Sequence, residues 1–312
     1  MNPSRQELST RIKKIMKEEG FLDCGIARAA PLRKEATSLR QWLEKAYHGE
    51  MTYMENHFGK RADPTRLVEG SRSVITVLHN YYPQKRQGKE SRYRISTYAY
   101  GKDYHAVIRE KLHSAAKKIA EITGNFRYRA FTDSAPIMDK VWARKSGLGW
   151  IGKNTCLISK KHGSFFFIGH LVCDLELEND REETKNYCGT CRKCLDACPT
   201  GALIKPGILD ARKCISYLTI ELKNEMPEDL AEKTAPWIFG CDICQDVCPW
   251  NRFAKPHKEN YYLPAEALLA MPASAWENLS RTDFNRLFHQ SPLLRAGYEK
   301  IHENIRIAKR HS

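Results

Sequence analysis

Long hydrophobic runs are missing from the sequence. No stretch of its 312 residues approaches the roughly 18 consecutive apolar residues that a membrane-spanning helix needs, and no apolar signal core follows the N-terminus. Low-complexity tracts are missing as well, and no internal repeat is visible outside two short cysteine runs. We therefore expect a cytoplasmic protein that does not enter a membrane.

Cysteine, in contrast, is plentiful, with eleven residues. The stretch 188–199 has the spacing C-x2-C-x2-C-x3-C-P, by which a compact loop presents thiolates to a [4Fe–4S] cluster. Structural zinc sites usually separate two pairs of cysteines by a long gap, which this stretch lacks. The spacing therefore favours an iron–sulfur cluster over zinc, and zinc over disulfides, so it indicates a reducing compartment.

A second, incomplete cysteine run follows at 241–249. Ile238 stands where the first cysteine of a full run would fall, and Cys214 is the obvious substitute upstream. In two-cluster ferredoxins the fourth cysteine of each run binds the other cluster. This rule predicts two [4Fe–4S] clusters, the first held by Cys188, Cys191, Cys194 and Cys248 and the second by Cys198, Cys214, Cys241 and Cys244. The remaining cysteines are expected to be buried, inert thiols: Cys24, Cys156 and Cys173.

Length and pattern predict an α+β protein of more than one domain. Helical and strand-like segments alternate over residues 1–180, which predicts an α/β sandwich around one sheet. The β-branched run Ser73–His79 is expected to be a central strand, and Phe165–Cys173 is too apolar for an exposed edge. Residues 181–255 are expected to form a ferredoxin-like domain with two clusters, and residues 256–312 a helical C-terminal extension.

The net charge of +14 is unevenly distributed. Residues 1–180 carry 32 basic and 20 acidic side chains, whereas residues 181–250 carry 9 basic and 11 acidic ones. Residues 251–312 are again basic, with 10 basic and 6 acidic side chains. A basic surface suggests a polyanionic partner, nucleic acid first, although a merely soluble basic surface explains the charge about equally well.

Two further motifs are ambiguous when they are considered alone. Gly147, Gly149 and Gly152 match the letters G-x-G-x-x-G, but they follow a predicted helix rather than a strand, which disfavours a dinucleotide site. A backbone that passes close to a bulky ligand would explain these glycines as well. Asp133 lies between a predicted strand and a predicted helix at 135–145. Local sequence favours Asp133 as the N-cap of that helix over a functional carboxylate at the sheet end.

Several segments together resemble the epoxyqueuosine reductase family: Tyr98–His105, Asp133–Thr155, both cysteine runs and Cys214–Glu221. The resemblance extends in order over essentially the whole chain. It implies a cytosolic, cobalamin-dependent iron–sulfur enzyme, related in fold and chemistry to reductive dehalogenases. Such an enzyme acts on epoxyqueuosine at the wobble position of tRNA and completes queuosine synthesis. The basic first domain and the lack of an export signal count against one rival, a reductase of small molecules; another rival is a non-catalytic electron carrier.

The resemblance also implies roles for individual residues. Asp133 matches the family's proposed proton donor, a role that would need a raised pKa in an apolar pocket. Asp103-Tyr-His105 begins the cobalt-ligand pattern D-x-H-x-x-G, but Ile108 stands at the glycine position, which fits base-off cobalamin without a protein histidine on cobalt. By position, the residues expected around the corrin are His57, Tyr98, Tyr104, His105, Asp133, Asn154, Thr155 and Ser216.

Partners follow from the same resemblance. Longer family members carry a C-terminal helical-repeat domain that helps to grip tRNA, whereas this sequence ends at residue 312. Recognition of tRNA is then expected to rely on the basic first domain, on Lys223 and on the tail residues Arg306, Lys309 and Arg310. We also expect a monomer that receives electrons from an unidentified low-potential donor.

Overall fold

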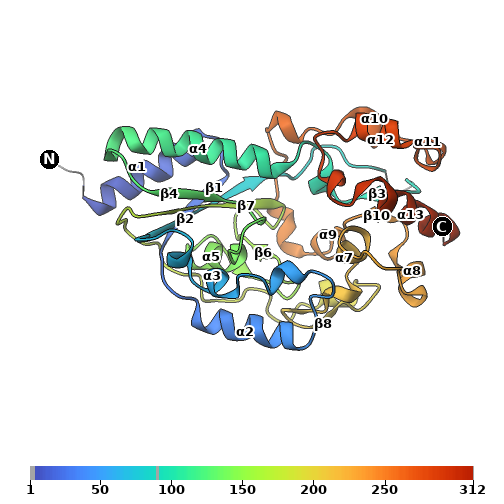
Figure 1. The fold of residues 1–312 in the computed structure, drawn as a ribbon, viewed down its shortest axis with the longest axis horizontal. Coiled ribbons are helices and arrows are strands. Elements are labelled where there is room, and N and C mark those ends of the chain that lie inside the picture. The colour runs from blue at the N-terminus through green and yellow to red at the C-terminus, as the bar shows by residue number, and fades with distance from the viewer. Residues whose placement is uncertain (1–3, 89–90, 312) are drawn as a thin grey trace.

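The computed structural model describes residues 4–88 and 91–311. A four-stranded sheet with helices on both faces forms one half of the molecule, and short helices with small two-stranded ribbons form the other (Figure 1). The strands are β1 (Asp23–Arg28), β2 (Ser73–Asn80), β3 (Arg94–Ile95), β4 (Tyr128–Phe131), β5 (Trp150–Ile151), β6 (Leu157–Ile158), β7 (Phe166–Cys173), β8 (Leu203–Lys205), β9 (Ile208–Leu209) and β10 (Trp237–Phe239).

The helices vary greatly in length. The α-helices are α1 (Arg5–Glu18), α2 (Arg33–Glu44), α3 (Phe58–Ala62), α4 (Tyr104–Thr123), α5 (Asp139–Lys145), α6 (Lys193–Asp196), α7 (Ile215–Ile220), α8 (Glu228–Thr234), α9 (Ile243–Asp246), α10 (Glu266–Leu269), α11 (Ala273–Glu277), α12 (Arg281–Leu287) and α13 (Gly297–Arg310). The 3-10 helices are η1 (Thr52–Met54), η2 (Pro64–Arg66), η3 (Thr97–Ala99), η4 (Ala211–Lys213), η5 (Pro249–Phe253), η6 (Asn260–Tyr262) and η7 (Pro292–Arg295).

The main sheet has the order β1-β2-β7-β4, and each neighbouring pair is antiparallel. Strands β2 and β7 are central and almost entirely buried, as their continuous apolar runs predicted. Helices α1 and α4 cover one face through a core that includes Ile12, Met16 and Ile108. Helix α5 packs on the other face, where Trp142 is buried against Val74. The prediction of a sheet covered by helices is therefore confirmed.

Two helix starts follow directly from local sequence. Ser4 and Glu7 form the expected capping box at the start of α1, each side chain bonded to the other residue's backbone N–H. Asp103 caps α4 by accepting a hydrogen bond from the backbone N–H of His105 at 2.9 Å. Because each cap satisfies otherwise unpaired N–H groups, both helices begin where the sequence predicts.

The helix after Asp133 begins later than predicted. Helix α5 starts at Asp139, and its N-cap position is Met138. Asp133 therefore does not cap this helix, and the local interpretation of it as a cap is wrong. The cause is Pro136, because a proline disfavours helical backbone at the residue before it and so keeps Ala135 out of a helix. Asp133 lies in the loop that leaves the edge strand β4.

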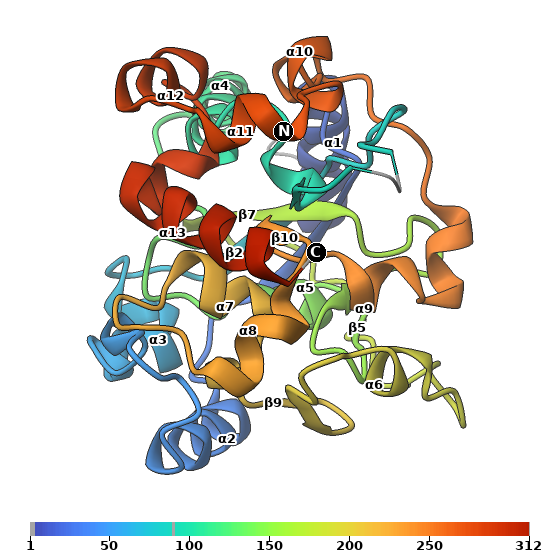
Figure 2. The ribbon, with the colours of Figure 1, turned by 90° about the vertical axis from the view of Figure 1, so that its right-hand side faces the viewer.

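The C-terminal helices share a hydrophobic core with distant segments. This core contains Tyr93 and Ile95 of the β3 region, Ile238 and Phe239 of β10, and Ile301 of α13. Strands β3 and β10 pair in parallel, and α13 lies along α7, α8 and β10 (Figure 2). Ile238 is completely buried there, which explains an isoleucine where a full cysteine run would have a cysteine. Since this core joins residues from all three predicted parts, the division at residues 180 and 255 stays a prediction.

Over residues 4–88 and 91–311, no helix combines the length and the apolar character that crossing a bilayer requires.

Candidate functional site

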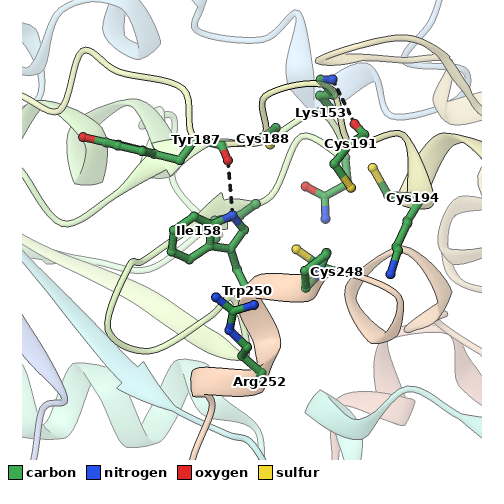
Figure 3. Close-up of a pocket in the computed structure, with 12 residues that line it drawn as sticks. Lys153, Ile158, Tyr187, Cys188, Cys191, Cys194, Cys248, Trp250 and Arg252 are labelled. Carbon is green, nitrogen blue, oxygen red and sulfur yellow. Dashed lines mark hydrogen bonds between the residues drawn. The ribbon is translucent and has the colours of Figure 1, made fainter.

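Four cysteine side chains from the two runs surround one cavity of about 250 Å³ (Figure 3). They are the four that the spacing rule assigns to the first cluster: Cys188, Cys191, Cys194 and Cys248. The loop between them is held in place by Lys153, whose Nζ donates hydrogen bonds to the carbonyl oxygens of Gly189 at 2.6 Å and Cys191 at 2.9 Å. Trp150 Nε1 donates to Cys188 Sγ at 3.4 Å.

The other predicted set of four cysteines is also gathered in one place. Cys214 interacts electrostatically with Cys198, Cys241 with both Cys214 and Cys198, and Cys244 with Cys241 and Cys214. Burial raises the pKa of the thiols of Cys214 and Cys241. A cluster would bind these side chains as thiolates, which the positive charge of its iron stabilises. The donor chemistry of both groups therefore fits an iron–sulfur cluster.

The three cysteines outside these groups do not behave alike. Cys24 and Cys173 are buried in the core around the sheet, and burial raises the pKa of Cys173 to about 12. Cys156, however, forms a side-chain hydrogen bond with Cys244. The prediction of an inert thiol therefore fits Cys24 and Cys173, but it does not describe the surroundings of Cys156.

Asp133 accepts two side-chain hydrogen bonds from residues at the start of α4. Tyr104 Oη donates to Oδ2, and His105 Nε2 lies 2.5 Å from Oδ1. His105 Nδ1 lies 2.6 Å from Asp103 Oδ1 on its other side. Burial, followed by the nearby charge of Asp133, raises the pKa of Tyr104 well above its ordinary value, so Tyr104 stays a phenol that can donate.

The surroundings of Asp133 differ from the apolar pocket that we expected. Its side chain is 50 % exposed and has two polar partners. Arg295 and Tyr53 also lie close enough to interact with the Asp133 charge. Arg295 is paired with Glu221 at 2.8 Å and lies over the Tyr53 ring. Neighbouring charges and hydrogen bonds, rather than an apolar wall, therefore surround this carboxyl group.

One short segment lies between the second cysteine group and the side chains hydrogen-bonded around Asp133, which are Asp103, Tyr104, His105 and Asp133 itself (the Asp133 group). The Tyr98 ring contacts the Tyr104 ring at 6.2 Å and the Phe239 ring at 5.9 Å. Ser96 Oγ and Thr97 N donate hydrogen bonds to the buried carboxylate of Asp242, which follows Cys241 directly in the chain. Residues 96–104 therefore lie between Asp133 and the second set of thiols.

The remaining predicted site residues fall into two sets. Asn154 Nδ2 donates to the carbonyl oxygen of Cys244 at 3.3 Å, Thr155 follows it, and the Ser216 backbone N–H donates to Cys214, so all three lie beside the second cysteine group. His57 starts α3 with a left-handed backbone and Lys223 binds Glu50 through its backbone N–H. Among the contacts of the described residues, none joins His57 or Lys223 to Asp133 or to a cysteine.

A larger cavity of about 650 Å³ opens beside the Asp133 group. Asp103, Tyr104 and His105 line one side, and residues 289–295 line the other. Sequence reasoning missed Arg295, Glu221 and Tyr53, because no local pattern marks them. They approach the Asp133 group only through contacts between segments far apart in the chain.

The glycines of the 146–152 stretch are explained by protein contacts. A Cβ on Gly149 would lie 2.1 Å from the carbonyl oxygen of Ile158, and one on Gly147 would lie 2.7 Å from that of Arg181. Gly147 also has a φ of +74°. These close approaches to backbone explain Gly147 and Gly149 without a dinucleotide, and a Cβ on Gly152 would lie 2.5 Å from the Ile158 side chain.

Comparisons with known proteins agree with this arrangement. Residues 61–134 match the family model described as epoxyqueuosine reductase QueG, DUF1730, and residues 187–251 match the 4Fe-4S double cluster binding domain. The epoxyqueuosine reductase of Cyclobacterium marinum is 51 % identical over 300 residues, covering 96 % of each chain.

Solved structures give the same result. A crystal structure of epoxyqueuosine reductase with an epoxyqueuosine-modified tRNA-Tyr stem loop superposes with a TM-score of 0.91 at 27 % identity, over 99 % of this chain and 82 % of that one. A reductive dehalogenase described with B12-dependent dehalogenation shares the fold alone, with a TM-score of 0.50 at 17 % identity over 98 % of this chain and 39 % of that one. This mixed α/β chain with a double-cluster domain belongs to the epoxyqueuosine reductase family.

Proposed function

We propose that this protein reduces epoxyqueuosine to queuosine at the wobble position of tRNA. In the proposal, the cysteine groups would hold two [4Fe–4S] clusters and nearby side chains a base-off cobalamin, which together would supply the electrons, and Asp133 donates a proton. The single observation that carries the proposal is that a hydrogen-bonded carboxyl group and the second group of four cysteines lie next to the same segment, residues 96–104. Relatives named epoxyqueuosine reductase, and a neighbour solved with a modified tRNA stem loop, support the substrate.

The two cysteine groups support the role of electron carrier. In the proposal the first cluster is held by Cys188, Cys191, Cys194 and Cys248 and the second by Cys198, Cys214, Cys241 and Cys244. The second group lies next to residues 96–104, whereas the first lines its own cavity. Electrons therefore enter at the first cluster, from a low-potential donor, and leave from the second toward the Asp133 group.

In the proposal, cobalamin would lie among the side chains between Asp133 and the second cysteine group. When bound, it would supply a low-valent cobalt centre that reduces the epoxide carbon. Tyr98, Tyr104, Asn154, Thr155 and Ser216 would hold the corrin and its amide side chains. Both ring nitrogens of His105 already have carboxylate partners, so neither offers a lone pair to cobalt. This supports base-off binding without a histidine ligand; His57 would contact the corrin from the start of α3.

The protein's own side chains would supply one of the protons that the reaction needs. Converting an epoxide to an alkene and water takes two electrons and two protons. Asp133, held by Tyr104 and His105, is oriented to deliver one of these protons to the departing oxygen. The arrangement fixes the carboxyl group before substrate arrives, which lowers the cost of orienting it in the transition state.

Binding of tRNA would rely on basic side chains. Lys223 and Arg306 are exposed, as are the neighbouring Lys309 and Arg310 near the end of α13. Contacts of this kind with phosphates give affinity that falls with salt, while the wobble base supplies specificity. We propose that the protein works as a cytoplasmic monomer.

The first prediction tests the function in cells. A strain that lacks its own epoxyqueuosine reductase is complemented with the parent chain, Asp133→Ala or the matched control Asp229→Ala, which changes an exposed aspartate on α8. Digested tRNA should contain queuosine with the parent and with Asp229→Ala, and epoxyqueuosine with Asp133→Ala. Normal queuosine in the Asp133→Ala strain would remove the proton-donor assignment, and none with the parent would contradict the function.

A small-molecule reductase is the second candidate. The fold shared with a reductive dehalogenase favours it, but that likeness concerns the fold alone. The two candidates differ in substrate: the dehalogenase-like candidate would consume electrons with a halogenated phenol and leave epoxyqueuosine in tRNA unchanged.

A further inference from the structure

His105 lies between two carboxylates. Its Nε2 is 2.5 Å from Asp133 Oδ1, and its Nδ1 is 2.6 Å from Asp103 Oδ1. An imidazolium ring donates from both nitrogens, so one proton is directed at each carboxylate. His105 is only 18 % exposed, whereas Asp103 and Asp133 are 46 % and 50 % exposed. The ring therefore connects two carboxylates that both reach solvent.

The position of the ring is fixed by the helix start. Asp103 is the N-cap of α4, and the same oxygen that meets His105 Nδ1 also accepts the backbone N–H of His105 at 2.9 Å. The Tyr104 ring stacks on His105 at 4.2 Å and on Phe167 of β7 at 4.0 Å. These contacts restrain the ring from turning away from Asp133.

The charges around the ring favour the imidazolium. Partial burial alone would lower the pKa of His105, but the hydrogen bonds to Asp103 and Asp133 outweigh it and raise the pKa to about 9. Further ionisable groups surround this chain of side chains, through charge interactions or in the lining of the cavity of about 650 Å³: Tyr53, Tyr98, Lys102, Tyr104, Arg109, Glu110, Glu221, Tyr261, Tyr262, His289 and Arg295.

We propose that Asp103, His105 and Asp133 form a proton relay, in which His105 supplies the proton that Asp133 donates and Asp103 positions the ring. The relay rests on the proposed function, because it gives the proposed proton donor a source. Asp133 is half exposed and accepts hydrogen bonds from two donors, so it does not lie in the apolar pocket that would keep a carboxyl group protonated. In the relay, the proton that Asp133 donates comes instead from the neighbouring His105 ring.

The reduction of the epoxide consumes two electrons and two protons. The epoxide loses its oxygen as water, both C–O bonds break and a C=C bond forms, with two electrons from a low-potential one-electron reductant through the clusters. One proton passes from His105 Nε2 to Asp133 Oδ1 and from Asp133 to the departing oxygen, and the second comes from water. The neutral ring keeps its Nδ1–H on Asp103 and regains a proton from water in the cavity of about 650 Å³, which Asp103 and His105 both line.

The first test needs no activity. Deuterium exchange at the histidine ring carbon, followed by mass spectrometry of peptides across pH 5–10, gives the pKa of each histidine in the holoenzyme. His105 should titrate near pH 9 in the parent and at least about one unit lower in Asp103→Asn, which keeps the N-cap acceptor but removes the charge. His113, on the same helix but bonded to Tyr128, is the internal control and should not move.

The second test measures product formation against pH with an epoxyqueuosine-containing stem loop. Asp103→Asn should shift the alkaline limb of the profile to lower pH, so that its rate at pH 8.5 relative to pH 6.5 falls at least about threefold below that of the parent. His105→Gln should lower the rate at every pH by about 100-fold or more, and His113→Gln should match the parent.

The outcomes separate the relay from the function. If His105 titrates near its ordinary pKa of 6.5 in the parent, or if Asp103→Asn keeps the profile of an active parent, the relay is wrong while the proposed function stands. If the parent forms no queuosine, the proposed function fails and the relay has no reaction to serve.

Discussion

At the scale of single residues, the chemistry depends on how His105 shares its protons. Two carboxylates within 2.6 Å keep the ring charged well into the alkaline range. The same hydrogen bonds stabilise the folded protein, because the unfolded chain lacks them. Function and stability at this site therefore share one pH dependence.

The sign of that dependence follows from the raised pKa. The pKa of His105 rises from 6.5 to about 9 on folding, so its contribution is complete below pH 6.5 and is lost as pH rises to 9. After allowance for the solvent exposure of Asp103 and Asp133, we expect this contribution to the free energy of unfolding to be about 2 kcal/mol. His105→Gln should therefore lower Tm by about 5 °C more at pH 6 than at pH 9.5 in anaerobic thermal scans. An equal loss at both pH values, or the same trend in His113→Gln, would contradict this assignment.

Prediction from sequence worked best for residues whose pattern is local. Cysteine spacing alone grouped Cys248 with the first run, and the structure gathers the same sets of four thiols. Asp103-Tyr-His105 was harder, because it begins a cobalt-ligand pattern. The local sequence does not show that both ring nitrogens of His105 have carboxylate partners, because Asp133 reaches the ring from a separate loop.

At the scale of elements, the turn between β5 and β6 presents a strained residue beside the second cysteine group. Thr155 has a φ of +63°, a conformation that costs a β-branched residue about 1–2 kcal/mol. Its N–H still donates to the Gly152 carbonyl oxygen at 3.0 Å, and Cys156 follows it against Cys244. The strained backbone of Thr155 persists because these contacts of the turn hold it in place.

Relief of this strain should be measurable. Asparagine tolerates the left-handed region, so Thr155→Asn should raise the unfolding free energy by about 1 kcal/mol in chemical denaturation. Thr37→Asn, at an exposed position inside α2, serves as the matched control and should change stability by less than about 0.5 kcal/mol. A destabilised Thr155→Asn variant would show that the threonine side chain itself is needed in the turn.

The positions of helices with a local sequence signal could be predicted, whereas features that depend on contacts between distant segments could not. The capping box of Ser4 and Glu7 predicted the start of α1, and the apolar stripe after Tyr104 predicted α4. Pro136 delayed α5 and removed the cap role predicted for Asp133, and the antiparallel order of the sheet could not be read from the order of its strands. Strand order depends on pairing between residues about 100 positions apart, such as Ser73 with Cys173.

At the scale of the whole molecule, the C-terminal helices are packed into the same core as the segment before the site. Ile301 of α13 is fully buried and shares this core with Tyr93 and Phe239. The sequence predicted helices here but not their partners, because the contacts join residues about 200 positions apart. Ala99 and Tyr100 belong to this core and Tyr98 packs against it, so the core contacts the segment 96–104.

Truncation within this core should destabilise the molecule. Ile301→Ala should lower the unfolding free energy by about 2–4 kcal/mol, because it removes a fully buried side chain and leaves a cavity. The control Leu287→Ala, whose side chain is 50 % exposed, should cost less than about 0.5 kcal/mol. Equal effects in denaturant titrations would mean that α13 does not belong to the core.

The central claim is that electrons from two clusters and a proton from Asp133 meet on epoxyqueuosine. Its most direct measurement is nucleoside mass spectrometry of an epoxyqueuosine stem loop after incubation with the purified, cluster-loaded protein, cobalamin and a strong reductant. We predict queuosine in the complete mixture, and only epoxyqueuosine when cobalamin is withheld or when Asp133→Ala replaces the parent. Queuosine formed at the parent's rate without cobalamin, or by Asp133→Ala, would contradict the account.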